Sequence, residues 1–96
     1  LGFSDIGRSP HDVLDGRYDR DGAIPCQIDG GLKCFGHPIG ATGLRMAYDV
    51  YLQLLGRAGE RQLRGRSGRG PALGLIHNLG GIPNRNIASV SILGLL

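Results

Sequence analysis

The chain has 96 residues, of which 41% are hydrophobic, and it carries a formal net charge of +3 at neutral pH. This composition suits one small folded domain and excludes a collagen-like or low-complexity chain, because the 18 glycines cluster in bends between apolar runs. No apolar stretch has the length of a membrane helix, and the first twenty residues lack the pattern of a signal peptide. We therefore expect a cytoplasmic protein without a membrane span.

Residues 1–25 are predicted to form a loop-rich lead-in. Glycine and proline recur every few positions, and no apolar periodicity persists. Ser9 and Pro10 can begin a short helical turn. His11 lies in an acidic stretch, as expected of a surface residue.

A corner around His37 follows. From Cys26 to Phe35, a loose alternation of apolar residues predicts a short strand or an extended loop. Pro38 fixes its own φ and keeps the preceding residue extended, so we expect His37 on a rigid corner just ahead of a helix. The partial positive charge of a helix start favours a neutral imidazole, which can accept a proton. The alternative is a buried histidine that is bonded to a backbone carbonyl.

The two cysteines, Cys26 and Cys34, are too few for the disulfide framework of a secreted protein. Cys34 and His37 are spaced like a pair of metal ligands. A zinc site needs a second closely spaced pair, which the sequence does not offer. We predict neither a structural disulfide nor a metal site.

The stretch from Gly40 to Gly56 has helical periodicity. Six apolar side chains recur at spacings of three and four, which predicts an amphipathic helix with that face buried. The tyrosines among them are expected to pack in the core or at its rim rather than to take part in chemistry. The six are Leu44, Ala47, Tyr48, Tyr51, Leu52 and Leu55.

Basic residues are concentrated in the second part of the chain. Residues 1–32 hold six aspartates and three arginines, a net charge of −3, whereas residues 33–96 hold eight basic and two acidic side chains, a net charge of +6. This distribution suits an anionic ligand or partner. The arginine-rich stretch has no aromatic residues for base stacking, so we predict a solvated, mobile loop and no nucleic-acid partner. Its arginines are Arg57, Arg61, Arg64, Arg66 and Arg69.

Two strand-like runs close the chain. Residues 72–76 are almost wholly apolar, and residues 87–93 alternate between apolar side chains and serine. Residues 80–86 supply the turn residues of an antiparallel connection. The sequence therefore predicts an α/β fold in which strands of a mixed sheet pack on one long helix.

Several glycine-rich motifs of the chain resemble the C-terminal part of thiolases, which make or break carbon–carbon bonds in acyl-coenzyme A thioesters. The last motif is similar to the version found in the sterol carrier protein-type and lipid-transfer-type branch. The resemblance covers roughly residues 22–94 and implies that residues 26–96 are a thiolase-like C-terminal half-domain. The motifs are Gly30–Leu32, Gly36–Pro38, Gly40–Gly43, Gly56–Gln62 and Leu75–Gly81.

The resemblance assigns His37 the role of a catalytic base that also polarises the thioester, and it places Gly36 and Pro38 in the substrate pocket. It implies a nucleophilic cysteine in an N-terminal half that this chain does not contain. Neither Cys26 nor Cys34 matches that cysteine.

The final motif is implied to be the last active-site loop. Here His77 is a candidate catalytic acid/base, a thioester-contacting group, or a hydrogen-bonded residue at a strand end. Asn78 and the backbone N–H of Gly80 are candidate donors to the thioester oxygen. Many thiolases carry a cysteine in this loop, and its absence from residues 77–81 resembles the sterol carrier protein-type branch.

The resemblance implies the C-terminal segment of an acyl-CoA acyltransferase of lipid metabolism, with a coenzyme A thioester as substrate and no covalently bound cofactor. The implied partners are the N-terminal thiolase half, a second copy in a homo-oligomer and, as in lipid-transfer-type members, a small OB-fold subunit. We expect the chain to be a piece of a longer enzyme and to be inactive alone. Two alternatives stay open: a retro-aldolase acting on an acyl-CoA thioester, and a non-catalytic structural or partner-binding module.

Overall fold

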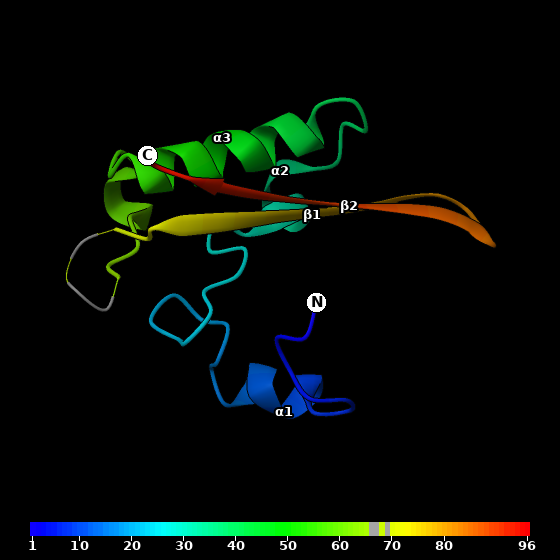
Figure 1. The fold of residues 1–96 in the computed structure, drawn as a ribbon, viewed down its shortest axis with the longest axis horizontal. Helices are drawn as coiled ribbons and strands as arrows, with labels where there is room; N and C mark the ends of the chain where they lie inside the picture. The colour runs from blue at the N-terminus through cyan, green and yellow to red at the C-terminus, as the bar shows by residue number, and fades with distance from the viewer. Residues whose placement is uncertain (66–67, 69) are drawn as a thin grey trace. The chain divides into compact units, whose positions relative to one another are not determined.

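The computed structural model describes residues 1–65, 68 and 70–96. The chain forms two compact units, Leu1–Gly36 and His37–Leu96. Helices occur in both units and a two-stranded sheet in the second, which confirms the α/β class (Figure 1). No helix in the described ranges is both long enough and apolar enough to cross a bilayer.

The first unit contains α1 (Ser9–Leu14), the short helix that the sequence predicted. Pro10 occupies its first turn, where the missing N–H has no helical partner to lose. The Nε of Arg8 lies 3.4 Å from Oδ1 of Asp12, which is buried. This ion pair compensates the carboxylate for its loss of solvent. His11 is exposed, as predicted.

A second short helix, α2 (Gly31–Phe35), lies where a strand or an extended loop was predicted, so that prediction is wrong for the second half of residues 26–35. Gly30 and Gly31 have φ values of 87° and 57°, which turn the chain sharply and end any extended run. The Asp29 carboxylate accepts a hydrogen bond from the Gly31 N–H at 2.9 Å. It thereby satisfies a donor that a helix start leaves unpaired.

In the second unit, α3 (Thr42–Leu54) confirms the predicted helix. It begins two residues later and ends two residues earlier than predicted. The predicted buried face is wrong in part, because Leu44, Tyr48 and Tyr51 are 75%, 61% and 51% exposed. The two tyrosine rings lie nearly parallel, at 24°, with centroids 6.5 Å apart. They therefore pack against each other on the outside of α3 and not in the core.

The strands β1 (Leu73–Ile82) and β2 (Arg85–Gly94) form an antiparallel hairpin in which every residue of β1 has a partner on β2. Both strands are longer than predicted, because most of the expected turn at residues 80–86 is strand. The turn itself is Pro83 and Asn84. Proline fixes the first φ and Asn84 supplies a φ of 65°, as a two-residue type II turn requires.

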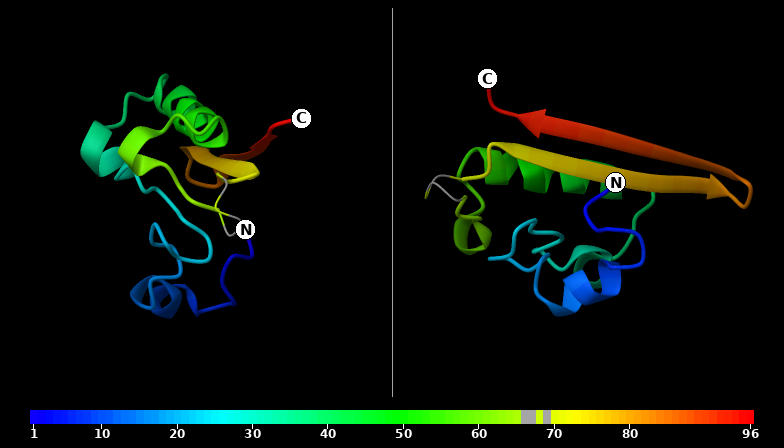
Figure 2. Two further views of the ribbon diagram at one scale, coloured as in Figure 1. Left: turned by 90° about the vertical axis from the view of Figure 1, so that its left-hand side faces the viewer. Right: turned by 60° about the horizontal axis from the view of Figure 1, so that its bottom comes forward.

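One face of the hairpin packs against α3 (Figure 2). Burial alternates along the first part of β1, where Ile76 is 6% exposed. A Cβ on Gly74 would collide with the side chain of Val50, so glycine at this position lets the helix and the strand approach closely. Residues 74, 76 and 78 of β1 therefore face α3, and residues 75 and 77 face away from it.

Two glutamines close the C-terminal end of α3. Gln53 is buried, its Nε2 donates to the Arg61 carbonyl at 2.8 Å, and its Oε1 accepts from the Leu63 N–H at 2.9 Å. The Nε2 of Gln62 donates to the Gln53 carbonyl at 3.0 Å, and its Oε1 accepts from the Ala58 N–H at 3.0 Å. The pair thus bonds backbone groups of Ala58, Arg61 and Leu63 in the segment that follows α3, and it adds a donor to the Gln53 carbonyl, which also accepts the Gly56 N–H at 3.2 Å. We call it the glutamine clasp.

The 3-10 helix η1 (Gly59–Arg61) lies in the arginine-rich segment that was predicted to be a mobile loop. Nη1 of Arg61 donates to Oδ1 of Asp49 on α3 at 2.8 Å, so this part of the segment is tied to the fold. Arg66 and Arg69, on which the same prediction depends, lie outside the described residues.

We expect Gln53→Leu to lower the free energy of unfolding of the full-length protein by about 2 kcal/mol. Leucine has a similar size, but it leaves the Arg61 carbonyl and the Leu63 N–H without side-chain partners. The shift in urea midpoint, followed by circular dichroism, measures the effect. Arg57→Gln, at an exposed position near the same helix end, is the control. Equal midpoints for the two variants would show that the clasp does not stabilise the fold.

Candidate functional site

His37 lies on an exposed corner directly before α3. The preceding Gly36 has φ 71° and ψ −172°, a combination that is essentially restricted to glycine. The Nδ1 of His37 lies 2.8 Å from Oγ1 of Thr42, the first residue of α3. The alternative of a buried histidine bonded to a carbonyl is therefore wrong, and Nε2 is the ring atom that His37 can offer to a ligand.

Pro38 shapes this corner through its carbonyl. The oxygen accepts the backbone N–H groups of Ala41 and Thr42, each at 2.9 Å, and the Thr42 hydroxyl at 3.0 Å. Three donors converging on one oxygen wind the chain from the proline directly into α3. The imidazole ring is thereby held close to the start of a helix, as the sequence predicted.

Asn78 lies on the face of β1 that meets α3. A Cβ on Gly43 would lie 3.8 Å from Nδ2 and 3.9 Å from Oδ1 of Asn78, so the amide rests against the first turn of the helix. Gly43 directly follows Thr42, the hydrogen-bond partner of His37. The structure therefore brings His37 and Asn78 to the same end of α3.

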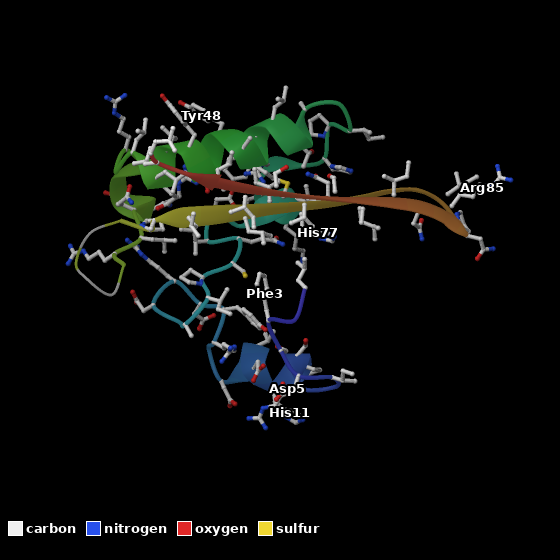
Figure 3. The ribbon with its side chains drawn as sticks, in the orientation of Figure 1. Phe3, Asp5, His11, Tyr48, His77 and Arg85 are labelled. Atoms are coloured by element: carbon white, nitrogen blue, oxygen red, sulfur yellow. The ribbon has the colours of Figure 1, made fainter. Side chains whose placement is uncertain are left out.

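His77 and Gly80 are also part of β1, and not of the loop that was predicted for them. His77 is exposed on the face of the strand that points away from α3 (Figure 3). Because neighbouring residues of a strand point to opposite faces, the structure does not bring His77 together with Asn78. Gly80 shares the face of Asn78, and no described atom lies within 4 Å of the point where its Cβ would be.

The thiols of Cys26 and Cys34 are free and exposed. Partial desolvation by neighbouring atoms nevertheless raises the pKa of the Cys26 thiol. At neutral pH this group is therefore a protonated thiol and a poor nucleophile. Among the residues that the structure describes, no three His, Cys, Asp or Glu side chains gather as metal ligands would.

Thr42 is the residue of this site that the sequence prediction missed. It is 5% exposed and bonds to both the His37 ring and the Pro38 carbonyl. The sequence offered one sign of this contact, a hydroxyl side chain five residues after the histidine and two residues after Gly40. Threonine at a helix start is normally taken for a cap, so its contact with the ring was not inferred.

An exposed imidazole and an amide at one helix end can supply a proton acceptor and a hydrogen-bond donor to the same ligand. Residues 1–94 match the sequence model of the family described as thiolase C-terminal domain-like. The chain belongs to the thiolase family. The family match confirms the resemblance of the glycine-rich motifs.

Three curated relatives indicate where this thiolase segment lies among known proteins. An acetyl-CoA acetyltransferase of Methanothermobacter thermautotrophicus is 44% identical over 81 residues, which are 84% of this chain and 20% of that protein. Sterol carrier protein 2 of Homo sapiens is 47% identical over 51 residues, 53% of the chain and 8% of that protein. Non-specific lipid-transfer protein-like 2 of Caenorhabditis elegans is 36% identical over 63 residues, 66% of the chain and 15% of that protein.

The thiolase segment thus spans a fifth or less of the length of these relatives. No solved structure matches it.

Proposed function

We propose that the chain supplies the base and one thioester-binding side chain of a thiolase-like acyl-CoA acyltransferase. The observation that carries the proposal is the exposed His37 ring, which is held through Nδ1 at the start of α3 so that Nε2 is free to meet a substrate. Asn78, at the same end of α3, provides an amide donor. From the family resemblance, we also assign Gly36 and Pro38 to the substrate pocket.

The chemistry needs a nucleophile that another part of the protein provides. Nε2 of His37 takes the proton of a cysteine thiol in the N-terminal half, and the thiolate attacks the carbonyl carbon of the acyl-CoA thioester. The negative charge that develops on the carbonyl oxygen is stabilised by the side-chain amide of Asn78. Coenzyme A then leaves as a thiolate and recovers the proton from His37, and the acyl group stays on the cysteine.

The acetyl-CoA acetyltransferase among the relatives supports a coenzyme A thioester as substrate. The net charge of +6 on residues 33–96 suits the phosphates of such a ligand. We further propose that this chain is inactive without its N-terminal half and that it works in the cytoplasm, in lipid metabolism, as part of a homo-oligomer. The sterol carrier and lipid-transfer relatives favour the branch in which a small OB-fold subunit is a further candidate partner.

One sequence feature favours a second candidate, a retro-aldolase acting on a β-hydroxyacyl thioester. Residues 77–81 lack the second cysteine, the acid/base that many thiolases carry in this loop. Retro-aldol cleavage needs one base and no acyl-cysteine, so it suits this altered loop. In that reaction His37 would take the hydroxyl proton while the carbon–carbon bond breaks to give an aldehyde or ketone and the enolate of an acyl-CoA. The enolate would then take the proton back from His37.

The full-length protein should be assayed with acetoacetyl-CoA and free coenzyme A, and with a β-hydroxyacyl-CoA. With the first substrate, we expect the cysteine thiolate to attack the 3-keto carbon, so that the enolate of acetyl-CoA leaves and takes up the proton held by His37. Free coenzyme A then accepts the acetyl group, which gives a second acetyl-CoA. An acetylated cysteine should appear in the mass spectrum of the quenched enzyme. Cleavage of the second substrate alone, without an acyl-enzyme, would replace acyl transfer by the retro-aldol reaction. No turnover of either substrate would leave the non-catalytic module as the function.

A further inference from the structure

We propose that Thr42 is a positioning residue that holds His37 in the tautomer with its proton on Nδ1 and its lone pair on Nε2. The tautomer follows from the hydrogen bonds of the chain alone. Its catalytic consequence rests on the proposed function of His37.

The tautomer follows from counting hydrogens at one hydroxyl group. A threonine hydroxyl has one hydrogen to donate and lone pairs with which to accept. The Thr42 hydroxyl donates to the Pro38 carbonyl at 3.0 Å, and a carbonyl oxygen can only accept. Toward His37 Nδ1, at 2.8 Å, the hydroxyl oxygen must therefore accept, and Nδ1 must carry the hydrogen.

The opposite assignment makes fewer hydrogen bonds. If the hydroxyl donated to Nδ1, its contact with the Pro38 carbonyl would no longer be a hydrogen bond. One bond would then remain where two are formed. Thr42 is 5% exposed, so solvent has little access to make up the loss.

The arrangement also persists through the reaction. When Nε2 accepts a proton, the ring becomes an imidazolium whose Nδ1–H still donates to Thr42. The acceptor is fixed in place, because its side chain is β-branched and lies on the first residue of α3. Proton transfer at Nε2 therefore requires no rearrangement on the opposite side of the ring.

Thr42→Val and Thr42→Ser form a matched pair for the test. Valine keeps the shape of threonine and removes the hydroxyl, whereas serine keeps the hydroxyl. The Pro38 carbonyl retains the N–H groups of Ala41 and Thr42 in both variants, so neither leaves it without a partner. Thermal unfolding of the full-length variants checks that each of them folds.

Two readouts separate the tautomer from the chemistry. Nitrogen-15 chemical shifts of the His37 ring, assigned by their absence in His37→Gln, report which nitrogen carries the proton. We expect the Nδ1–H form in the wild-type protein and in Thr42→Ser, and a shift toward the Nε2–H form in Thr42→Val. We expect Thr42→Val to lower kcat with acetoacetyl-CoA about 10-fold, the factor associated with one hydrogen bond, while KM changes little.

The outcomes distinguish the two ideas. An unchanged tautomer in Thr42→Val would overturn the positioning role of Thr42, whatever the rate does. A changed tautomer with an unchanged rate would support the positioning role and remove His37 from the proposed mechanism. A changed tautomer with the expected fall in kcat, restored in Thr42→Ser, would support both.

Discussion

Replacement of His37 by alanine in the full-length enzyme is expected to lower kcat/KM for acetoacetyl-CoA by at least about 100-fold, the low end for removal of a positioned base. The ring is exposed and is held through Nδ1 by Thr42, so Nε2 is the atom that we propose to meet the substrate. Alanine removes that atom. The hydrogen bonds of the Pro38 carbonyl that start α3 are kept, so the fold should survive.

His11→Ala is the matched control, since His11 is also an exposed histidine but lies in α1 of the first unit. It should behave like the wild type in kcat, in KM and in thermal unfolding. A near-normal rate for His37→Ala would exclude this histidine as the base. A large loss in both variants would point to a general effect on folding.

Replacement of Asn78 by alanine is expected to lower kcat about 100-fold with little change in KM, as for the loss of one donor to a developing oxyanion. The amide rests against the first turn of α3, next to Thr42 and on the side of β1 that faces the helix. Asn78→Asp is the sharper variant, because it keeps the shape and removes the N–H donors. We expect a similar loss from aspartate, whereas a packing role would spare it.

Comparison of His77→Ala with Asn78→Ala shows which of these two neighbouring residues of β1 takes part in the reaction. His77 is exposed on the opposite face of the strand, so we expect a smaller loss than for Asn78→Ala. A loss as large as that of Asn78→Ala would restore His77 as the acid/base of the reaction. It would also require the substrate to reach the outer face of the hairpin.

The features that the sequence predicted correctly depend on local patterns. The helix at residues 42–54 follows from its periodicity, and the corner at His37 follows from the restrictions that Pro38 imposes. The family could be recognised because glycine-rich motifs constrain the backbone at many adjacent positions. Asn78 was proposed as a site residue through the same likeness, and its role stays a prediction.

The features that were missed depend on tertiary contacts. Two contacts determine which face of α3 is buried: Val50 packs against Gly74, and the side-chain amide of Gln53 forms hydrogen bonds with the segment after the helix. The periodicity of apolar residues predicts neither contact. The helix at residues 31–35 depends on two glycines with positive φ. The role that we propose for Thr42 depends on the two hydrogen bonds of its hydroxyl group, which no sequence pattern gives.

A crystal structure of the full-length protein with a non-hydrolysable acyl-CoA analogue would show whether the end of α3 beside His37 and Asn78 is one wall of a thioester site. We expect the carbonyl oxygen of the analogue at about 3 Å from Asn78 Nδ2, and Nε2 of His37 facing the reactive carbon and the incoming thiol. A thioester carbonyl bound elsewhere, with the His37 ring facing solvent, would contradict this proposal.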